Sequence, residues 1–383
     1  MVVLGLVSFF NDLASEMVIP LIPILLAGVL GAGPVALGAI EGVADAVAAF
    51  FKLWSGRRSD WLGGRRKGLA LAGYLLSNSA RPLLGFAGSW AAVLLLRATD
   101  RAGKGLRSAP RDALVADSTP AAIRGFAYGF HRALDNSGAV AGSLVAALLV
   151  GWAADSLPQV IFWSAVPGFM GVALLALGVK EPPTAASPRP PLPPLRWAGL
   201  SAPMRRYLLV LGLFTFARAS ETFIVLRGHE LGMGVVQLLL LWAALNLAKA
   251  ATSTRGGLLS DRLGKERMIL MSWASYAVAF VLLGQVSQGH GLWLVTVAYG
   301  LFIGLSEGPE RALISDLAQA GEQGTAFGWY HLMLGIAAIP AGLLFGALWH
   351  YLGAATAFSY AGALAVLSAG LLHFWAWPGR SAR

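Results

Sequence analysis

The sequence predicts an all-α membrane protein with twelve transmembrane helices in two pseudo-symmetric halves of six, and three observations lead to this prediction. Hydrophobic residues make up 57% of the 383 residues and charged residues only 13%, whereas soluble domains carry about 25% charged residues. The apolar stretches run to roughly 20 residues, the length that crosses a bilayer as a helix. A sequence repeat recurs at about half the chain length, which is typical of membrane proteins built from two related halves.

Helices are the expected elements because a backbone in lipid must satisfy its own hydrogen bonds. The period-two alternation of a membrane β-barrel is missing from the sequence. The first stretch is expected to stay in the mature protein, since it lacks a basic leader and contains Asp12 and Glu16. The predicted spans are 3–28, 34–55, 68–87, 89–107, 124–150, 158–178, 206–227, 234–255, 267–286, 290–312, 324–349 and 353–376.

The repeat is clearest in two short segments that each lie between apolar stretches. Residues 56–63 (GRRSDWLG) match residues 257–264 (GLLSDRLG), and Ser15-Glu16 in the first span corresponds to Ser220-Glu221 in the seventh. Each half holds an even number of spans, so the two copies have the same orientation in the membrane. We expect an N-terminal half at 1–179, a proline-rich cytoplasmic linker at 180–205 and a C-terminal half at 206–383.

The formal charge of +10 is distributed as a topology signal. Lys and Arg crowd the connections after the second, fourth, sixth and eighth spans, whereas intervening connections such as 31–34 and 285–291 hold none. This positive-inside pattern places both termini in the cytoplasm. It indicates a multi-pass protein of the inner (plasma) membrane rather than a protein that binds nucleic acid. The chain has no cysteine, which excludes disulfides and thiolate metal sites.

At the repeated segments the sequence resembles the major facilitator superfamily (MFS) of secondary transporters. The resemblance implies two halves that rock about a central site in alternating access, with the first, fourth, seventh and tenth helices lining the cavity. The family's pattern after the second span is matched by Gly56, Asp60, Gly63, Arg65, Arg66 and Lys67, and its second copy by Gly257, Asp261 and Gly264.

The two aspartates of this motif are candidates for a gating contact. A carboxylate at the cytoplasmic end of one helix can accept hydrogen bonds from the exposed N–H groups at the start of another. We expect Asp60 to cap the eleventh span near Gly324 and Asp261 to cap the fifth near Gly125. Such contacts would latch the halves in one state and break in the other. The alternative is that these residues only anchor a tight basic turn.

Ionisable residues inside the predicted spans are functional candidates, because a charge in the bilayer core costs at least about 2.5–3.5 kcal/mol. Asp12 with Glu16, and Glu41 with Asp45, are spaced four residues apart and so share a helix face. Neighbouring carboxyl groups and desolvation both favour the protonated form. The proton-coupling candidates are therefore Asp12, Glu16, Glu41 and Asp45, with His131 second. The alternative role is that of buried ion pairs that only fix helix packing.

The cavity-lining helices implied by the resemblance supply the substrate-site candidates. Guanidinium groups on Arg97, Arg101 and Arg218 suit an anionic or zwitterionic solute, because they pair with carboxylate or phosphate through two hydrogen bonds. Arg81, Lys52 and Lys104 lie nearer the predicted span ends and are interpreted as structural. Asp135 of the fifth span and His331 of the eleventh are added to these helices' residues, so the full set of substrate-cavity candidates is Arg97, Asp100, Arg101, Asp135, Arg218, Glu221, Glu307 and His331.

Direction and cargo are less constrained. Gly129, Gly138 and Gly142 keep part of the glycine signature of drug exporters, which slightly favours export, although Gly138 and Gly142 also fit ordinary helix packing. His229 with Met233 leaves open the uptake of a metal ion or metal chelate, and a non-transporting receptor or scaffold is the alternative from another class.

The expected cargo is a small polar or charged organic solute moved with protons, by a monomer in the lipid bilayer. We find no phosphate-binding loop of an ATPase and no hydrolase or zinc-site motif. The sequence therefore predicts a protein that is not an enzyme and has no resident cofactor or metal.

Overall fold

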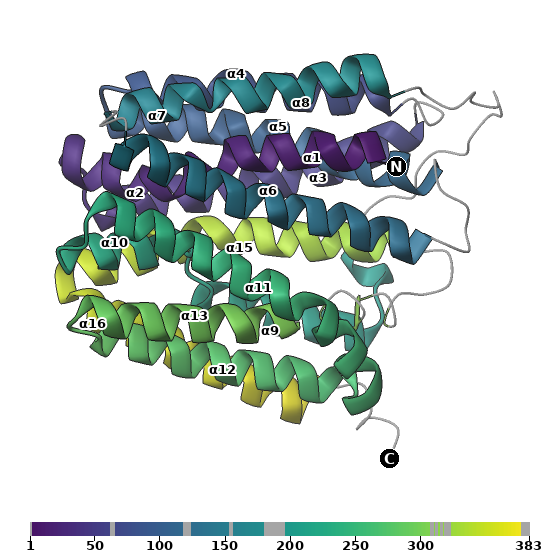
Figure 1. The fold of residues 1–383 in the computed structure, drawn as a ribbon. Coiled ribbons are helices and arrows are strands. Elements are labelled where there is room, and N and C mark those ends of the chain that lie inside the picture. The colour runs from purple at the N-terminus through teal and green to yellow at the C-terminus, as the bar shows by residue number, and fades with distance from the viewer. Residues whose placement is uncertain are drawn as a thin grey trace. The chain divides into compact units, whose positions relative to one another are not determined.

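The structure is a computed structural model that describes residues 2–61, 66–117, 124–152, 156–179, 196–306, 310, 313–314, 317 and 323–376. Every regular element in these residues is helical (Figure 1). The α-helices are α1 (Val2–Glu16), α2 (Ile22–Ile24), α3 (Pro34–Trp61), α4 (Lys67–Leu83), α5 (Trp90–Asp117), α6 (Arg124–Trp152), α7 (Leu157–Trp163), α8 (Ala165–Gly178), α9 (Ala202–Ala217), α10 (Thr222–Glu230), α11 (Val235–Leu263), α12 (Lys265–Gln285), α13 (Gly289–Ser306), α15 (Gln323–Leu352) and α16 (Ala354–Leu371). Short 3₁₀ or π segments are η1 (Ile19–Leu21), η2 (Leu25–Val29), η3 (Leu84–Phe86), η5 (Trp197–Gly199) and η6 (Leu372–Ala376).

Each predicted span coincides with one helix or with one run of consecutive helical segments. The first span is α1, η1, α2 and η2, the sixth is α7 with α8, and the seventh is α9 with α10. Among the described residues, nine helical stretches are long and apolar enough to cross a membrane on length and hydropathy alone. The other three predicted spans are α4, the charged helix α5 and α13. The all-helical membrane fold is confirmed.

Three helices continue past the ends that hydropathy predicts. α3 reaches Trp61, α5 reaches Asp117 and α11 reaches Leu263, because hydropathy marks only the lipid-embedded part of a helix. Gly56 and Asp60 therefore lie in the last turns of α3, and Gly257 and Asp261 in those of α11, beyond the ends of the predicted spans. Gly264 separates α11 from α12 with a φ of 88°, a left-handed conformation that favours glycine.

The helices form two compact units. The first contains the described parts of Met1–Ala32, Val43–Leu192 and Gly234–Ala243, and the second those of Gly33–Gly42, Pro193–Met233 and Ala244–Arg383. The units thus exchange short segments of α3 and α11 relative to a simple division at the linker. Most of the predicted linker lies outside the described residues, so the domain boundaries stay a prediction.

Close helix contacts in the first unit depend on glycine. A Cβ atom at Gly138 or Gly142 of α6 would lie 2.3 Å from a backbone oxygen of α1, that of Phe9 or Leu13. α4 and α5 approach one another in the same way at Gly73 and Gly103. Because any larger residue would push these helices apart, helix packing requires glycine at Gly138 and Gly142.

The second unit is held by stacked aromatic rings. Phe214 of α9 stacks on Trp273 of α12 with ring centroids 4.0 Å apart. Tyr276 stacks on Phe280 one turn further along α12, also at 4.0 Å. Phe280 in turn meets the ring of Phe358 of α16 edge to face. Offset and edge contacts of this kind are the favoured arrangements of aromatic pairs, and they fix α9 and α16 against α12.

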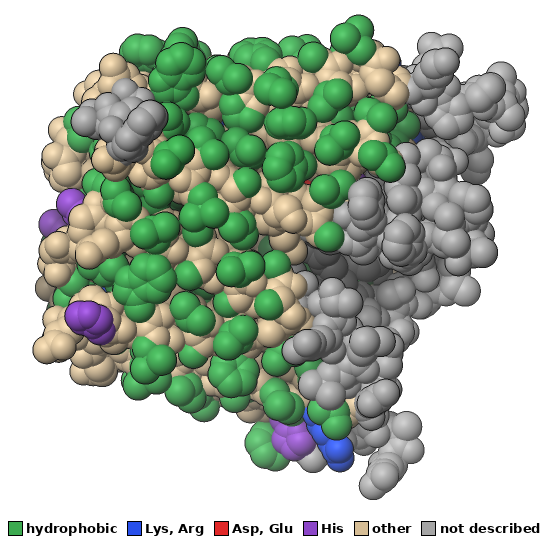
Figure 2. All heavy atoms as spheres, viewed as in Figure 1, with side chains coloured by type: hydrophobic (Ala, Val, Ile, Leu, Met, Phe, Trp, Pro, Cys, Tyr) green, Lys and Arg blue, Asp and Glu red, His purple; other side chains and the backbone are tan. Residues whose placement is uncertain are grey.

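The surface of the described residues is dominated by apolar side chains. Figure 2 shows hydrophobic side chains spread over the face in view, with few charged side chains among them. Large side chains such as Leu95, Leu177 and Leu294 are more than two-thirds exposed. A monomeric soluble protein rarely exposes so extensive an apolar surface, which is the surface expected of helices that face lipid.

Candidate functional site

The first and seventh spans, which are the repeated spans that carry the Ser-Glu pair, are both interrupted near their middle. α1 ends at Glu16, and the chain continues as the 3₁₀ segment η1 from Ile19. Pro20 explains this break, because it has no N–H to bond the carbonyl of Glu16 and its ring would clash with that carbonyl in a continuous helix. The predicted first span is therefore a run of helical segments rather than one regular α-helix.

The seventh span breaks without a proline. α9 ends at Ala217, Arg218 has a ψ of 78°, and α10 begins at Thr222. The hydroxyl of Tyr276 closes the gap: it accepts a hydrogen bond from the N–H of Ala219 at 3.1 Å and donates one to the carbonyl of Ala217 at 3.0 Å. The predicted span 206–227 is therefore also made of two successive helices, and the break between them carries both a guanidinium and a carboxylate.

Glu16, at the first break, accepts a hydrogen bond from a neutral donor. Nε1 of Trp242 donates to Oε2 of Glu16 at 2.6 Å, and both residues belong to the first unit. Asp12 lies one turn earlier, and its Oδ1 accepts a hydrogen bond from Nδ2 of Asn11 at 3.0 Å. Both of these donors are neutral, and the cationic side chains of Arg107, Lys104 and Arg111 also act electrostatically on Asp12.

Glu221, at the second break, has an ionic partner. The ammonium group of Lys249 on α11 pairs with Oε2 of Glu221, and the hydroxyl of Tyr299 on α13 donates to Oε1 at 3.0 Å. The nearby guanidinium of Arg218 lies 3.9 Å from Oε2 of Glu310, whose Oε1 accepts a hydrogen bond from Nε1 of Trp273 at 2.9 Å. The side chain of Arg218 is 40% exposed, whereas that of Glu310 is 8% exposed.

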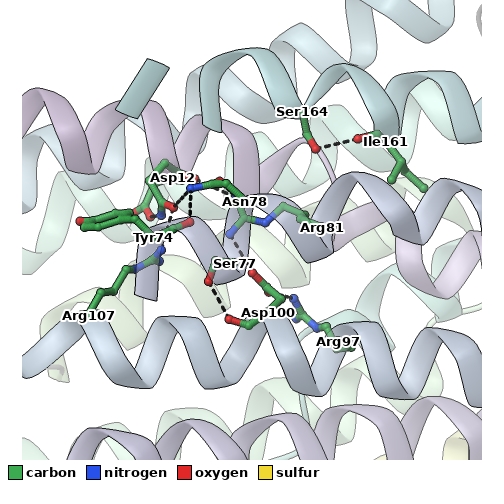
Figure 3. A network of polar contacts seen from close by, with 11 residues as sticks. Asp12, Tyr74, Ser77, Asn78, Arg81, Arg97, Asp100, Arg107, Ile161 and Ser164 are labelled. Atoms are coloured by element: carbon green, nitrogen blue, oxygen red, sulfur yellow. Dashed lines mark hydrogen bonds and ion pairs between the residues drawn. The ribbon is translucent and has the colours of Figure 1, made fainter. Parts of the chain in front are cut away.

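A buried ion triad links the third and fourth spans in the first unit (Figure 3). Asp100 of α5 pairs with Arg81 of α4 at 2.9 Å and with Arg97 of its own helix at 3.3 Å, and the three side chains are at most 3% exposed. Ser77 donates to the backbone carbonyl of Asp100 at 2.7 Å. Asp100 thus pairs with both Arg81 and Arg97. Of these three residues, Arg97 and Asp100 are predicted to bind substrate.

Asn11 of α1 is the centre of a second polar network, whose partners Asn78 and Arg107 are labelled in Figure 3. Its Oδ1 accepts hydrogen bonds from Nη1 of Arg107 at 2.7 Å and from Nδ2 of Asn78 at 3.3 Å. Oδ1 of Asn78 accepts from Nη1 of Arg81 at 2.9 Å, and the guanidinium of Arg107 lies over the ring of Tyr74, 4.6 Å from its centroid. The network ties α1, α4 and α5 together through neutral amides.

A third polar group surrounds His131 of α6. Nε2 of His131 is 2.8 Å from the hydroxyl of Ser8 on α1, and Nδ1 is 3.5 Å from Oδ2 of Asp135 one turn further along α6. Nη1 of Arg111 on α5 donates to the same Ser8 hydroxyl at 3.2 Å. Three helices therefore meet at one buried serine.

Two of the remaining candidates adjoin these groups, since Glu41 contacts Ser220 at the second break and Arg101 acts electrostatically on Asp100. Glu41 is buried and accepts a hydrogen bond from Ser220 at 3.3 Å, whereas Asp45, on the predicted shared face, is exposed. Arg101 and His331 are partly buried. Glu307, Gly63, Arg65 and the side chains of Asp60 and Asp261 fall outside the description, so the capping contacts stay a prediction.

Sequence reasoning missed several residues of these networks. Asn11 and Asn78 are uncharged, so a search for intramembrane charges passes over them. The third missed residue, Arg81, was interpreted as lying near a span end, but its spacing of three residues from Asn78 places both on one face of α4. Tyr276, Tyr299 and Trp242 act through a hydroxyl or an indole N–H, and no sequence motif marks them.

An all-helical bundle with an apolar surface, duplicated halves and paired charges inside its spans has the features of a secondary membrane transporter. The Major Facilitator Superfamily sequence model matches residues 4–341 and 208–383. The chain belongs to the Major Facilitator Superfamily and is a multi-pass membrane protein of this transporter family.

Relatives and solved structures agree with this assignment. An uncharacterized MFS-type transporter of Methanocaldococcus jannaschii is 30% identical over 377 residues, covering 97% of this chain and 93% of its own. An uncharacterized protein of Mycobacterium tuberculosis is 28% identical, and the match covers 91% of this chain and 86% of that protein. Among solved structures, a D-xylose–proton symporter superposes with a TM-score of 0.74 at 16% identity over 100% and 97% of the two chains. The human organic anion transporter MFSD10 superposes with a TM-score of 0.69 at 18% identity over 97% and 98%.

Proposed function

We propose that the protein is a proton-coupled secondary transporter that moves a small organic anion by alternating access. In this proposal Arg218 binds the anion and Glu16, assisted by Asp12, carries the proton. The transporter acts as a monomer with both termini in the cytoplasm. The observation that carries the proposal is the exposed guanidinium of Arg218 at the break in the seventh span.

Arg218 has the properties of an anion-binding residue. It lies near the middle of the span Ala202–Glu230, where a guanidinium facing lipid would be strongly unfavourable. Because its side chain is 40% exposed, it has to face water or a solute. Its carboxylate partner Glu310 is 3.9 Å away, a longer distance than the 2.7–2.9 Å of a strong charge-assisted hydrogen bond. A solute carboxylate or phosphate can therefore compete with Glu310 for the guanidinium.

Glu16 has the properties of a proton carrier. It lies near the middle of the span Val2–Val29, and the indole of Trp242 that contacts it is uncharged. Protonation of Glu16 therefore does not leave Trp242 with an unpaired positive charge. Glu221 and Asp100 differ, since protonating either would leave a lysine or arginine side chain without its carboxylate.

The fold by itself selects no solute. Solved structures that share it are named for a human organic anion transporter, a D-xylose–proton symporter and a nucleoside transporter, and one fold hosts many activities. The choice of an anion rests on the charge of Arg218. We propose export as the direction, following the three retained positions Gly129, Gly138 and Gly142. Transport measured in vesicles with a known orientation of the protein tests this direction.

The test is solute-dependent proton movement in proteoliposomes that contain a pH-sensitive dye. The solutes are lactate, glutamate, citrate, xylose, tetraphenylphosphonium and a divalent metal ion. We expect proton movement with at least one of the organic anions and a reduction of at least tenfold in the variant Arg218→Gln, because a charge-assisted contact is worth about 1.5–3 kcal/mol.

The matched control is Arg227→Gln. Arg227 lies in the same span but away from the break, and its guanidinium pairs with Glu230. Equal losses in Arg218→Gln and Arg227→Gln would contradict an anion site at Arg218. Transport of the organic cation, the metal ion or the sugar alone would contradict the anion assignment. Anion transport that proceeds without proton movement would contradict the coupling.

A further inference from the structure

The group around His131 has an ordered set of donors and acceptors. The hydroxyl of Ser8 has one hydrogen to donate and can accept two hydrogen bonds. The guanidinium of Arg111 can only donate, so Ser8 accepts from Arg111 at 3.2 Å. With a neutral imidazole that carries its hydrogen on Nδ1, Ser8 donates to Nε2 of His131 at 2.8 Å, and Nδ1 faces Oδ2 of Asp135 at 3.5 Å. In this state both hydrogen bonds of Ser8 point from Arg111 toward His131.

Protonation of His131 reverses the direction at Ser8. A protonated imidazole carries hydrogens on both nitrogens, so Nε2 then donates to the Ser8 hydroxyl instead of accepting from it. Two cationic donors, Arg111 and His131, would converge on one oxygen atom. Ser8 is 1% exposed and His131 4% exposed, so water screens the repulsion between the two cations poorly.

Asp135 is placed to favour the protonated histidine. It is 6% exposed, and its Oδ1 has no hydrogen-bond partner among the described residues. The charged and titratable groups around this site come from all the helices packed there: Asp12 of α1, Tyr74 of α4, Lys104, Arg107, Arg111 and Asp112 of α5, and Asp135 of α6.

Arg111 also has a carboxylate partner, Asp112, which stays in place if the contact with the Ser8 hydroxyl is lost. Its Nε and Nη2 donate to Oδ1 of Asp112 at 3.1 and 2.9 Å, and the side chain of Asp112 is 50% exposed. Losing the Ser8 contact thus leaves the guanidinium hydrogen-bonded to a half-exposed partner on its own helix. Upstream on α5, Arg107 keeps its hydrogen bond to Asn11 of α1, so the change is confined to the end of α5 beyond Arg107.

We propose that Ser8 and Arg111 are positioning residues through which protonation of His131 controls transport: the neutral histidine holds the end of α5 on α1, and the protonated histidine releases it. This inference rests on the proposed proton coupling and adds a proton site distinct from Glu16. It gives His131, a sequence-predicted proton candidate, a defined effect on a neighbouring helix.

The experiment uses the absence of cysteine from the chain. Nitroxide labels are attached at Leu6→Cys on α1 and Ser108→Cys on α5, and pulsed EPR measures their separation in nanodiscs between pH 5 and 8, the range in which histidine titrates. We expect the separation to lengthen on acidification, over about two pH units as for a single titrating group. In His131→Gln we expect one separation at all pH values.

Two further variants separate the switch from general packing. Ser8→Ala removes the shared oxygen atom and is expected to show the long separation at every pH. His290→Gln, which removes an exposed histidine of α13 in the second unit, is expected to keep the pH response of the labelled parent protein. A pH-independent separation in that parent, or an unchanged response in His131→Gln, would overturn the inference.

The same variants are then compared in the flux assay. We expect His131→Gln to flatten the pH profile of transport, a readout that loss of packing alone would not change. The EPR measurement needs no solute, so its failure overturns the Arg111–Ser8 switch without bearing on whether the solute is an anion. A positive EPR result with no anion-dependent proton flux would instead contradict the proposed function.

Discussion

The breaks in the first and seventh spans are two copies of one feature with different partners. Both carry the duplicated Ser-Glu pair, but the carboxylate of Glu16 contacts the neutral indole of Trp242, whereas that of Glu221 pairs with the ammonium of Lys249 and the hydroxyl of Tyr299. The first break is caused by Pro20, while the second is bridged by Tyr276. The duplicated carboxylates thus differ in these contacts, and the proposed function assigns proton exchange to Glu16 and a structural role to Glu221.

The largest expected effect is at the ion-paired copy. Glu221→Gln leaves the ammonium of Lys249, whose side chain is 16% exposed, without its carboxylate. We expect a loss of about 2–3 kcal/mol in stability, below the 3–5 kcal/mol of a fully buried pair, measured as a lower midpoint of thermal unfolding in detergent.

The double variant Glu221→Gln/Lys249→Met is the control for this prediction, because it removes both charges. It should recover more than half of the lost stability. Equal stability of the single and double variants would show that the pair does not hold the second break.

The bridge across the seventh span gives the next effect. Tyr276→Phe keeps the stacked ring but removes the hydroxyl that satisfies both Ala217 and Ala219. We expect a loss of about 1–3 kcal/mol for the two hydrogen bonds removed, about 0.5–1.5 kcal/mol each, because the N–H of Ala219 keeps its hydrogen bond of 2.9 Å to the carbonyl of Ala217. Tyr360→Phe, on a partly exposed tyrosine of α16, serves as the control, and an equal loss there would contradict a bridging role.

A smaller effect is expected at the first break. Trp242→Phe removes the indole N–H that donates a hydrogen bond to Glu16. We expect a loss of stability of about 1.5–2 kcal/mol, as for hydrogen bonds to charged groups. Glu16→Gln should cost less, about 1 kcal/mol or below, since an amide oxygen still accepts from the indole. If Glu16→Gln destabilises the protein more than Glu221→Gln does, the contrast between the two copies is wrong.

The smallest effect concerns the cause of the first break. Pro20→Ala restores an N–H opposite the carbonyl of Glu16 and allows α1 to continue. We expect stability to rise or fall by less than about 1 kcal/mol, because the gained hydrogen bond is offset by a changed path of η1 and α2. Proton-coupled transport should slow, since Glu16 would move from a helix end into a helix. Unchanged transport would show that the break is not needed.

Much of the fold follows from the sequence, because spans and duplication depend on local hydropathy and on matching segments. The pair Ser15-Glu16 and its copy Ser220-Glu221 pointed to two related positions, and both turned out to be helix breaks. The partners did not follow from the sequence. Trp242 and Glu16 are 226 residues apart, and the hydroxyl of Tyr276 reaches Ala217 only after α9 and α12 have packed. The break at Arg218 contains no proline or glycine from which it could be predicted.

The charged residues of the fourth span show the same limit. Spacing identified Arg97, Asp100 and Arg101 as interior charges, but it did not tell which would remain available to a solute. The structure uses Asp100 to neutralise Arg81 and Arg97, and leaves Arg218 in the other unit as the more exposed guanidinium. Burial and pairing, which depend on neighbouring helices, decide between the two roles.

The central claim is that Glu16 exchanges a proton and Glu221 does not, and infrared difference spectroscopy between acidic and neutral pH tests it most directly. The measurement records the C=O band of protonated carboxylic acids in reconstituted protein. We predict that part of this band disappears in Glu16→Gln and is kept in Glu221→Gln/Lys249→Met. Loss of the band in the double variant, with an unchanged band in Glu16→Gln, would contradict the account.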